Sequence, residues 1–155
     1  MQRTPIAGLL ATGIFLALAS GIATWRFFGM LSSIPVTVSA TLWLLFLICI
    51  MATLKVRKNL AEGTIGLDRS QLDPLLVARF MILGKASAWT GAIIGGIYSG
   101  MAAYLLAISG DNIAASQDAP GAALSALGGI ALTAAGVWLE RTCEVAPPAD
   151  PEAIG

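Results

Sequence analysis

The chain has 155 residues, of which 57% are hydrophobic and 12% charged, and its net charge is zero. Soluble globular domains carry about 25% charged residues, so this composition excludes that class. The sequence contains no histidine, which is the commonest metal ligand and general base. We therefore expect no catalytic residue, no metal ion, no cofactor and no nucleic-acid partner.

Four stretches carry no charged residue: residues 4–25, 27–54, 86–110 and 119–139. A helix needs about 20 apolar residues to cross the hydrocarbon core of a bilayer. We predict an all-α integral membrane protein with four transmembrane helices, at approximate spans 5–25, 34–54, 82–108 and 120–139. They form one domain, residues 1–141, and residues 142–155 form a short acidic, proline-rich tail.

The first stretch has two readings. An Ala-Leu-Ala triplet ends just before Ser20, as at a signal-peptide cleavage site. However, the apolar run is longer than the usual 7–15 residues of a signal peptide. It ends in an aromatic and basic cluster around Arg26, which is typical of a membrane interface. We predict an uncleaved first transmembrane helix.

The second stretch is bulky on all sides through residues 42–48, which predicts the lipid-exposed helix of the bundle. Its Cys49 is predicted to be a small buried residue. Cys143 follows the fourth stretch and is predicted to be a free thiol of the tail in a reducing compartment. A disulfide needs Cα atoms within about 7 Å, which a helix centre and a tail seldom provide.

The third helix is predicted to begin at Pro74. Proline is tolerated at the first helical position, and Asp73 before it can cap the first turn. A helix from Pro74 to Ile108 is about 50 Å long at 1.5 Å per residue. The hydrocarbon core is only about 30 Å thick. The first turns of this helix are therefore predicted to extend on the cytoplasmic side.

Positive charges predict the orientation. Lys55, Arg57 and Lys58 follow the second stretch, whereas residues 109–120 contain Asp111 and Asp118 but no Lys or Arg. Short loops rich in Lys and Arg stay in the cytoplasm. We therefore predict a multi-pass protein of the plasma membrane with both termini inside.

Small residues recur along three of the helices. In lipid, small residues let helix backbones approach closely. One interpretation is tight packing within one four-helix bundle. The other is that a stripe, above all on the third helix, contacts a second copy or another membrane protein. The candidate packing residues are Gly13, Gly21, Gly84, Ala88, Gly91, Gly95, Gly96, Ser99, Gly100, Gly129 and Gly136.

Basic residues gather at the predicted cytoplasmic ends of the helices. They can anchor the helices at the interface, because long basic side chains reach toward phosphates. Alternatively, they form a collar that binds anionic phospholipid or a partner. The candidates are Arg79, Lys85, Arg141, Lys55, Arg57 and Lys58.

Several segments match the sequence motifs of a known family. They are Leu-Asp-Pro-Leu at 72–75, Leu-Gly-Lys-Ala-Ser at 83–87, Tyr-Leu-Leu at 104–106 and Leu-Glu-Arg-Thr-Cys at 139–143. Together they resemble an actinobacterial membrane family catalogued as domain of unknown function 3180. The resemblance implies four-helix membrane proteins, often encoded near folate-synthesis enzymes, with no established activity. The chain departs from the family pattern at Thr142, where an aromatic residue is common, and at Glu144, where a basic one is.

Three functions fit the sequence. The first is a non-catalytic accessory or scaffolding subunit that packs against another membrane protein. The second is a component of an oligomeric small-molecule transporter or channel, although no ionisable residue is predicted deep in the membrane, where it would mark a transport path. The third is an enzyme that uses the charged cytoplasmic rim, but no nucleophile–base pair is visible. We expect the first.

Overall fold

The computed structural model describes residues 4–27, 35–61 and 74–144. They form four α-helices: α1 (Ile6–Phe27), α2 (Val36–Ala61), α3 (Pro74–Ile108) and α4 (Ile113–Glu144). Each helix is long and apolar enough to cross a membrane. No strand occurs in these three ranges, so the predicted all-α class with four transmembrane helices is confirmed.

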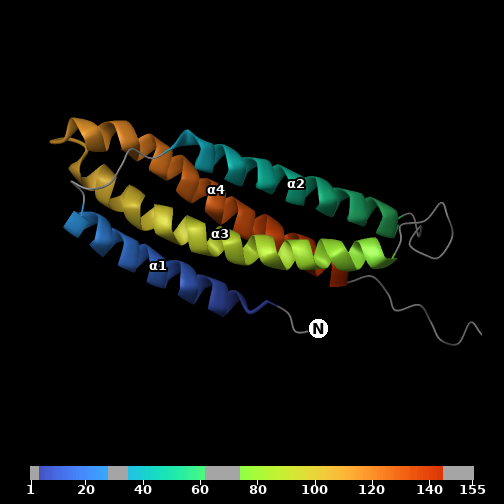
Figure 1. Cartoon of the computed structure of the whole chain (residues 1–155). Helices are drawn as coiled ribbons and strands as arrows, with labels where there is room; N and C mark the ends of the chain where they lie inside the picture. Colours follow the sequence, from blue (N-terminus) through green and yellow to red (C-terminus); the bar gives the residue numbers. More distant parts are fainter. Residues whose placement is uncertain (1–3, 28–34, 62–73, 145–155) are drawn as a thin grey trace, which may run out of the picture.

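The helices form one elongated bundle in which α3 and α4 are the central pair (Figure 1). Helix α1 packs against α3, and α2 packs mainly against α4. Within the described ranges the backbones of α1 and α4 do not come close to each other. The first residues of α1 and the last turn of α4 lie at the same end of the bundle (Figure 1). The chain therefore passes along the bundle four times in alternating directions.

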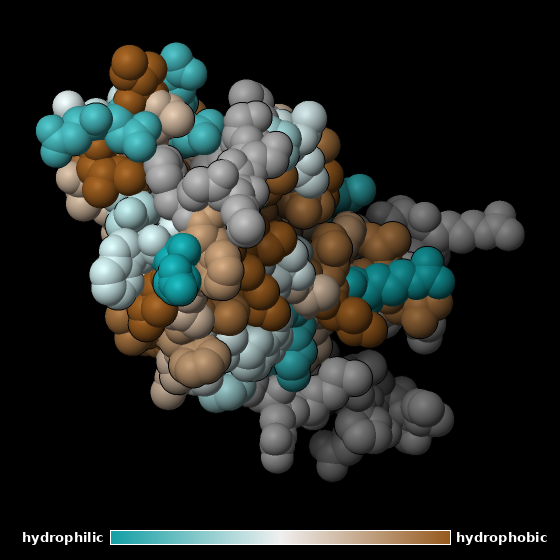
Figure 2. All heavy atoms as spheres, turned by 60° about the vertical axis from the view of Figure 1, so that its left-hand side comes forward, coloured by the Kyte–Doolittle hydropathy of each residue, from teal (hydrophilic) through white to brown (hydrophobic). Residues whose placement is uncertain are grey.

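Hydrophobic side chains cover much of the outside of the bundle. Figure 2 shows brown and pale residues over most of the face in view, with hydrophilic residues in small separate groups. Large apolar residues such as Phe15, Met51 and Ile130 are between 58% and 71% exposed. A soluble protein rarely exposes so much contiguous apolar surface. Together with the length of the helices, this surface identifies a multi-pass membrane protein.

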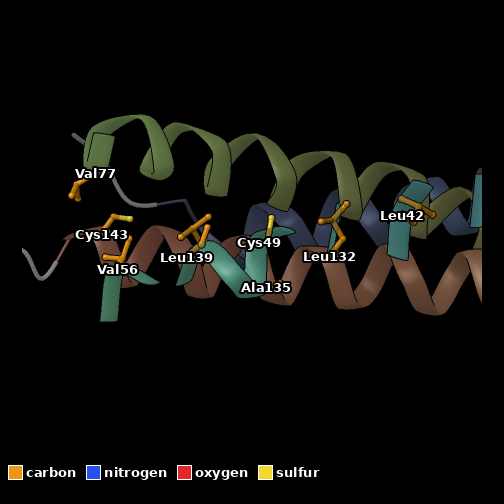
Figure 3. Close-up of a cluster of buried hydrophobic side chains, with 9 residues drawn as sticks. Leu42, Cys49, Val56, Val77, Leu132, Ala135, Leu139 and Cys143 are labelled. Atoms are coloured by element: carbon orange, nitrogen blue, oxygen red, sulfur yellow. The ribbon is translucent and has the colours of Figure 1, made fainter. Parts of the chain in front are cut away.

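The core between α2 and α4 follows a seven-residue period. On α2, Leu42, Cys49 and Val56 are almost completely buried. They meet Leu132 and Leu139 of α4 in one cluster, which Figure 3 shows as a row of side chains along the bundle. Residues seven apart lie on one side of a helix, so this spacing gives α2 a continuous buried face.

Two predictions about these helices are wrong. Helix α2 is not the lipid-exposed member, because 28% of its apolar window is buried, against 6% for α1. Cys143 does not lie in a tail, because α4 continues to Glu144 and the thiol is buried in the α2–α4 core. Cys49 is buried, as predicted. In both cases tertiary packing decides which side of a helix is covered. The size of the side chains in the sequence does not reveal that packing.

Helix ends follow local signals. Helix α3 begins at Pro74 and ends at Ile108, as predicted, while Asp73 lies outside the described residues. Helix α4 begins at Ile113, earlier than expected, because the Asn112 side chain accepts hydrogen bonds from the N–H groups of Ala114 and Ala115. Such a cap satisfies the unpaired donors of a first turn. The predicted loop at residues 109–120 is therefore helical over its second half.

Candidate functional site

The glycines of α3 divide between its two neighbours. Toward α4, a Cβ atom added to Gly91 would lie 2.6 Å from the Gly129 carbonyl oxygen. A Cβ atom added to Gly84 would lie 2.9 Å from the backbone of Gly136 and of Glu140. Such distances are shorter than real Cβ contacts. The backbones of α3 and α4 are therefore in direct contact.

Toward α1, the contacts are equally close. A Cβ atom added to Gly96 would lie 2.6 Å from the Gly13 carbonyl oxygen, and Gly21 lies against the backbone of Gly100. The Ser20 hydroxyl donates a hydrogen bond of 2.8 Å to the carbonyl oxygen of Ile97, which links the two helices.

The remaining packing candidates lie in or beside these contacts. Ala88 is fully buried next to Gly136, and a Cβ atom added to Gly95 would meet Gly129 at about 3.0 Å. Ser99 donates to the Gly95 carbonyl within its own helix. The α3 stripe thus serves contacts inside the chain, as the single-bundle interpretation describes.

An apolar groove lies on the side of the bundle where α1 and α4 stand apart. It has a volume of about 690 Å³. Its floor is α3, and its walls are α1 and α4. The lining residues are Ile6, Leu9, Leu10, Gly13, Ile14 and Ala17 of α1; Gly91, Ala92, Gly95, Gly96 and Ser99 of α3; and Ile130, Thr133, Ala134, Val137, Trp138 and Arg141 of α4.

Two of the six basic candidates lie in the lining of this groove or against a residue of that lining. Arg141 is the charged residue of its lining. The Arg57 guanidinium lies 5.9 Å from the centroid of the Trp138 ring, which also lines the groove. This distance is within the range of a cation–π interaction.

The other four basic candidates lie outside the groove. Arg79, Lys55 and Lys58 are exposed, and Lys85 is half-buried. None of these four lines the groove. The structure therefore gathers part of the predicted basic collar, around Trp138.

A buried carboxylate lies close to this end. Glu140 is 2% exposed, and its Oε1 accepts a hydrogen bond of 2.9 Å from the backbone N–H of Thr4. Neither its Oε2 nor the Thr4 hydroxyl has a hydrogen-bond partner among the described residues. The bond ties the start of α1 to the last turns of α4.

Sequence reasoning, which predicted no ionisable residue deep in the membrane, missed this burial of Glu140. A signal was available, because Glu140 follows Gly136 by four residues and so lies on the glycine side of α4. That side faces α3, as the contact with Gly84 shows.

Comparison with known proteins adds one finding. Residues 9–147 match the family described as "Protein of unknown function (DUF3180)". The chain belongs to this family. No curated protein and no solved structure matched the chain. The DUF3180 match spans parts of all four helices, in agreement with the resemblance seen in the sequence.

The described part of this DUF3180 protein presents an apolar groove with basic residues at one end. The groove offers apolar walls, and Arg141 and Arg57 offer positive charge at its end. Cys49 and Cys143 are free and buried. No cluster of three His, Cys, Asp or Glu residues suited to a metal ion occurs in the ranges that the structure describes.

Proposed function

We propose that this protein is a non-catalytic accessory subunit that packs against another protein of the plasma membrane. One observation carries the proposal: α1 is attached along one side only. Along its length it packs against α3, and its backbone comes close to no other helix of the described bundle; the link to α4 is the hydrogen bond of Thr4, just before α1, to Glu140. Most of its surface is therefore available to a partner.

The surface of α1 that points away from α3 suits a close helix–helix contact. Ala7, Ala11, Ala19 and Ala23 are all exposed and follow one another at spacings of four or eight residues. Residues four apart are neighbours on a helix surface. Small side chains at this spacing let another transmembrane helix approach closely on either side of Phe15, which is 70% exposed and lies between Ala11 and Ala19 in the same row. We call these four alanines the outer face of α1.

A photo-crosslinking amino acid at Ala11 or Ala19 tests the proposal. We expect a discrete adduct with a second membrane protein in intact cells, detected as a band shift and identified by mass spectrometry. The matched control is the same amino acid at Leu47, which is 55% exposed on α2. Adducts with lipid alone from both α1 positions would contradict an accessory role. An adduct of twice the chain mass would point to a homo-oligomer, as the transporter alternative requires.

A second prediction concerns the orientation of the chain in the membrane. In intact cells, an impermeant maleimide should label Ser116→Cys, because Ser116 is exposed at the end of the bundle predicted to lie outside. Ala61→Cys, exposed at the opposite end, should react only after permeabilisation. The reverse pattern would overturn the proposed orientation. Native Cys143 is buried, so its protection from the reagent carries no information about sidedness.

A further inference from the structure

We infer that the groove between α1 and α4 binds one acyl chain of an anionic phospholipid, whose head group is bound by Arg141 and Arg57. The inference does not depend on the proposed accessory role, since the outer face of α1 does not line the groove. Four features of the groove support it: its walls, its charge, its length and its floor.

The walls suit a hydrocarbon chain. Leu10 and Ile14 of the α1 wall are each 60% exposed, and Ile130 of the α4 wall is 58% exposed. The backbones of α1 and α4 do not come close to each other, which leaves room between the two walls. An acyl chain that packs between these walls gains van der Waals contacts that water or a loosely packed chain would not make.

The charge selects an anionic head group. Arg141 lines the groove at the end where the last turns of α2 and α4 meet. Its side chain forms no hydrogen bond or ion pair with the described residues. Arg57 lies over Trp138 beside it. Tryptophan is enriched at the head-group level of a membrane, and the long side chain of arginine reaches toward that level. The carboxylate of neighbouring Glu140 is buried against Thr4.

The length of the groove matches one leaflet. Its lining runs over eleven residue steps on α1, from Ile6 to Ala17, and on α4 from Ile130 to Arg141. At 1.5 Å per step this is about 16 Å, roughly half of a 30 Å hydrocarbon core. A lipid chain occupies one leaflet, whereas a transmembrane helix of a partner needs a track across both. The length therefore favours a lipid.

The floor explains why the groove is deep. Gly91, Gly95 and Gly96 contribute backbone to the floor, and each is held there by close contact with α4 or α1. Further along, Gly21 and Gly100 bring α1 and α3 together, and the lining ends. The groove thus runs from the basic end to about the middle of α1 and of α4.

Native mass spectrometry of the purified protein tests this inference. Phosphatidylglycerol and phosphatidylcholine with identical acyl chains are added in turn, and the retained adducts are compared. We expect a preference for phosphatidylglycerol that falls about fivefold in Arg141→Gln, the effect of one basic residue near an anionic surface. The matched control is Arg79→Gln, which removes an exposed charge outside the groove and should leave the preference unchanged.

A second variant tests the chain-binding part. Ala134 is exposed in the groove wall, so Ala134→Phe fills the groove without entering a helix contact. We expect retention of both lipids to fall at least tenfold. Ala86→Phe, exposed on α3 outside the groove, is the control. If Ala134→Phe does not fold, Ile130→Phe replaces it. Unchanged retention in the folded groove variant, an unchanged preference in Arg141→Gln, or a protein mass in place of the lipid would each overturn the inference. Competition by free glycerol phosphate would also overturn it, because a head group alone would then suffice.

Discussion

Replacing Gly91 or Gly95 with leucine is expected to lower the free energy of unfolding in detergent by about 3 kcal/mol, the upper range for overpacking a close contact. A side chain at Gly91 collides with the carbonyl of Gly129 and with the backbone and hydroxyl of Thr133. These atoms belong to a helix backbone, so they cannot move aside as a flexible side chain does. The two helices must separate, and the central contact of the bundle is lost.

Two matched substitutions show whether the effect belongs to the α3–α4 contact. Ile93 lies between the two glycines but is 40% exposed, so Ile93→Leu keeps the volume and should cost under about 1.5 kcal/mol. Gly110 has no atom within 4 Å of an added Cβ, so Gly110→Ala should leave stability nearly unchanged. Unfolding would be followed by circular dichroism in mixed micelles. Equal stability of all these variants would remove α3 as the packing centre.

The elements that the sequence predicts well are those determined locally. Four uncharged stretches predict four helices because length and hydrophobicity suffice to cross a membrane. The start of α3 at Pro74 follows from the fixed backbone of proline at a first helical position. The seven-residue spacing of Leu42, Cys49 and Val56 can also be read from the sequence. The bulky residues between them make α2 look apolar on all sides, so its buried face was not predicted.

Features that depend on the arrangement of helices could not be predicted in this way. The small residues of α3 fit either a bundle or an oligomer, and only the structure shows Gly91 against α4 and Gly96 against α1. The groove exists because α1 and α4 both pack on α3 without meeting. Such a gap leaves no periodic pattern. Arg57 and Arg141 are far apart in the sequence. Trp138 connects them, because Arg57 lies over its ring and Trp138 lines the groove together with Arg141.

The burial of Glu140 also depends on the arrangement of the helices and could not be predicted from the sequence around it. A carboxylate near a helix end is usually solvated, and taking it out of water is costly. Here the side chain lies on the glycine side of α4, beside Gly84, and the start of α1 covers it through Thr4. The contact spans 136 residues of sequence, so no local pattern reports it. Substitutions of Glu140 therefore test whether this hydrogen bond holds the start of α1 in place.

Glu140→Leu is expected to be less stable than Glu140→Gln by about 1–3 kcal/mol, the cost of leaving a buried donor without its acceptor. Both substitutions remove the carboxylate charge, so the cost of burying that charge cancels in the comparison. Glutamine keeps a carbonyl oxygen that can accept from the N–H of Thr4, whereas leucine has none. The difference therefore isolates the hydrogen bond between Thr4 and α4.

Hydrogen exchange gives this prediction a local readout. In Glu140→Leu, backbone amides of residues 4–9 should exchange faster, since the start of α1 loses its link to α4. The amides of Leu132 and Leu139, buried in the α2–α4 core, should keep their protection. Thr4→Ala is the matched control, because it removes a hydroxyl without a partner among the described residues and keeps the N–H donor. If the leucine and glutamine variants have equal stability and equal exchange over residues 4–9, Glu140 does not hold α1 in place. The glycine contacts with α3 would then be sufficient to position that helix.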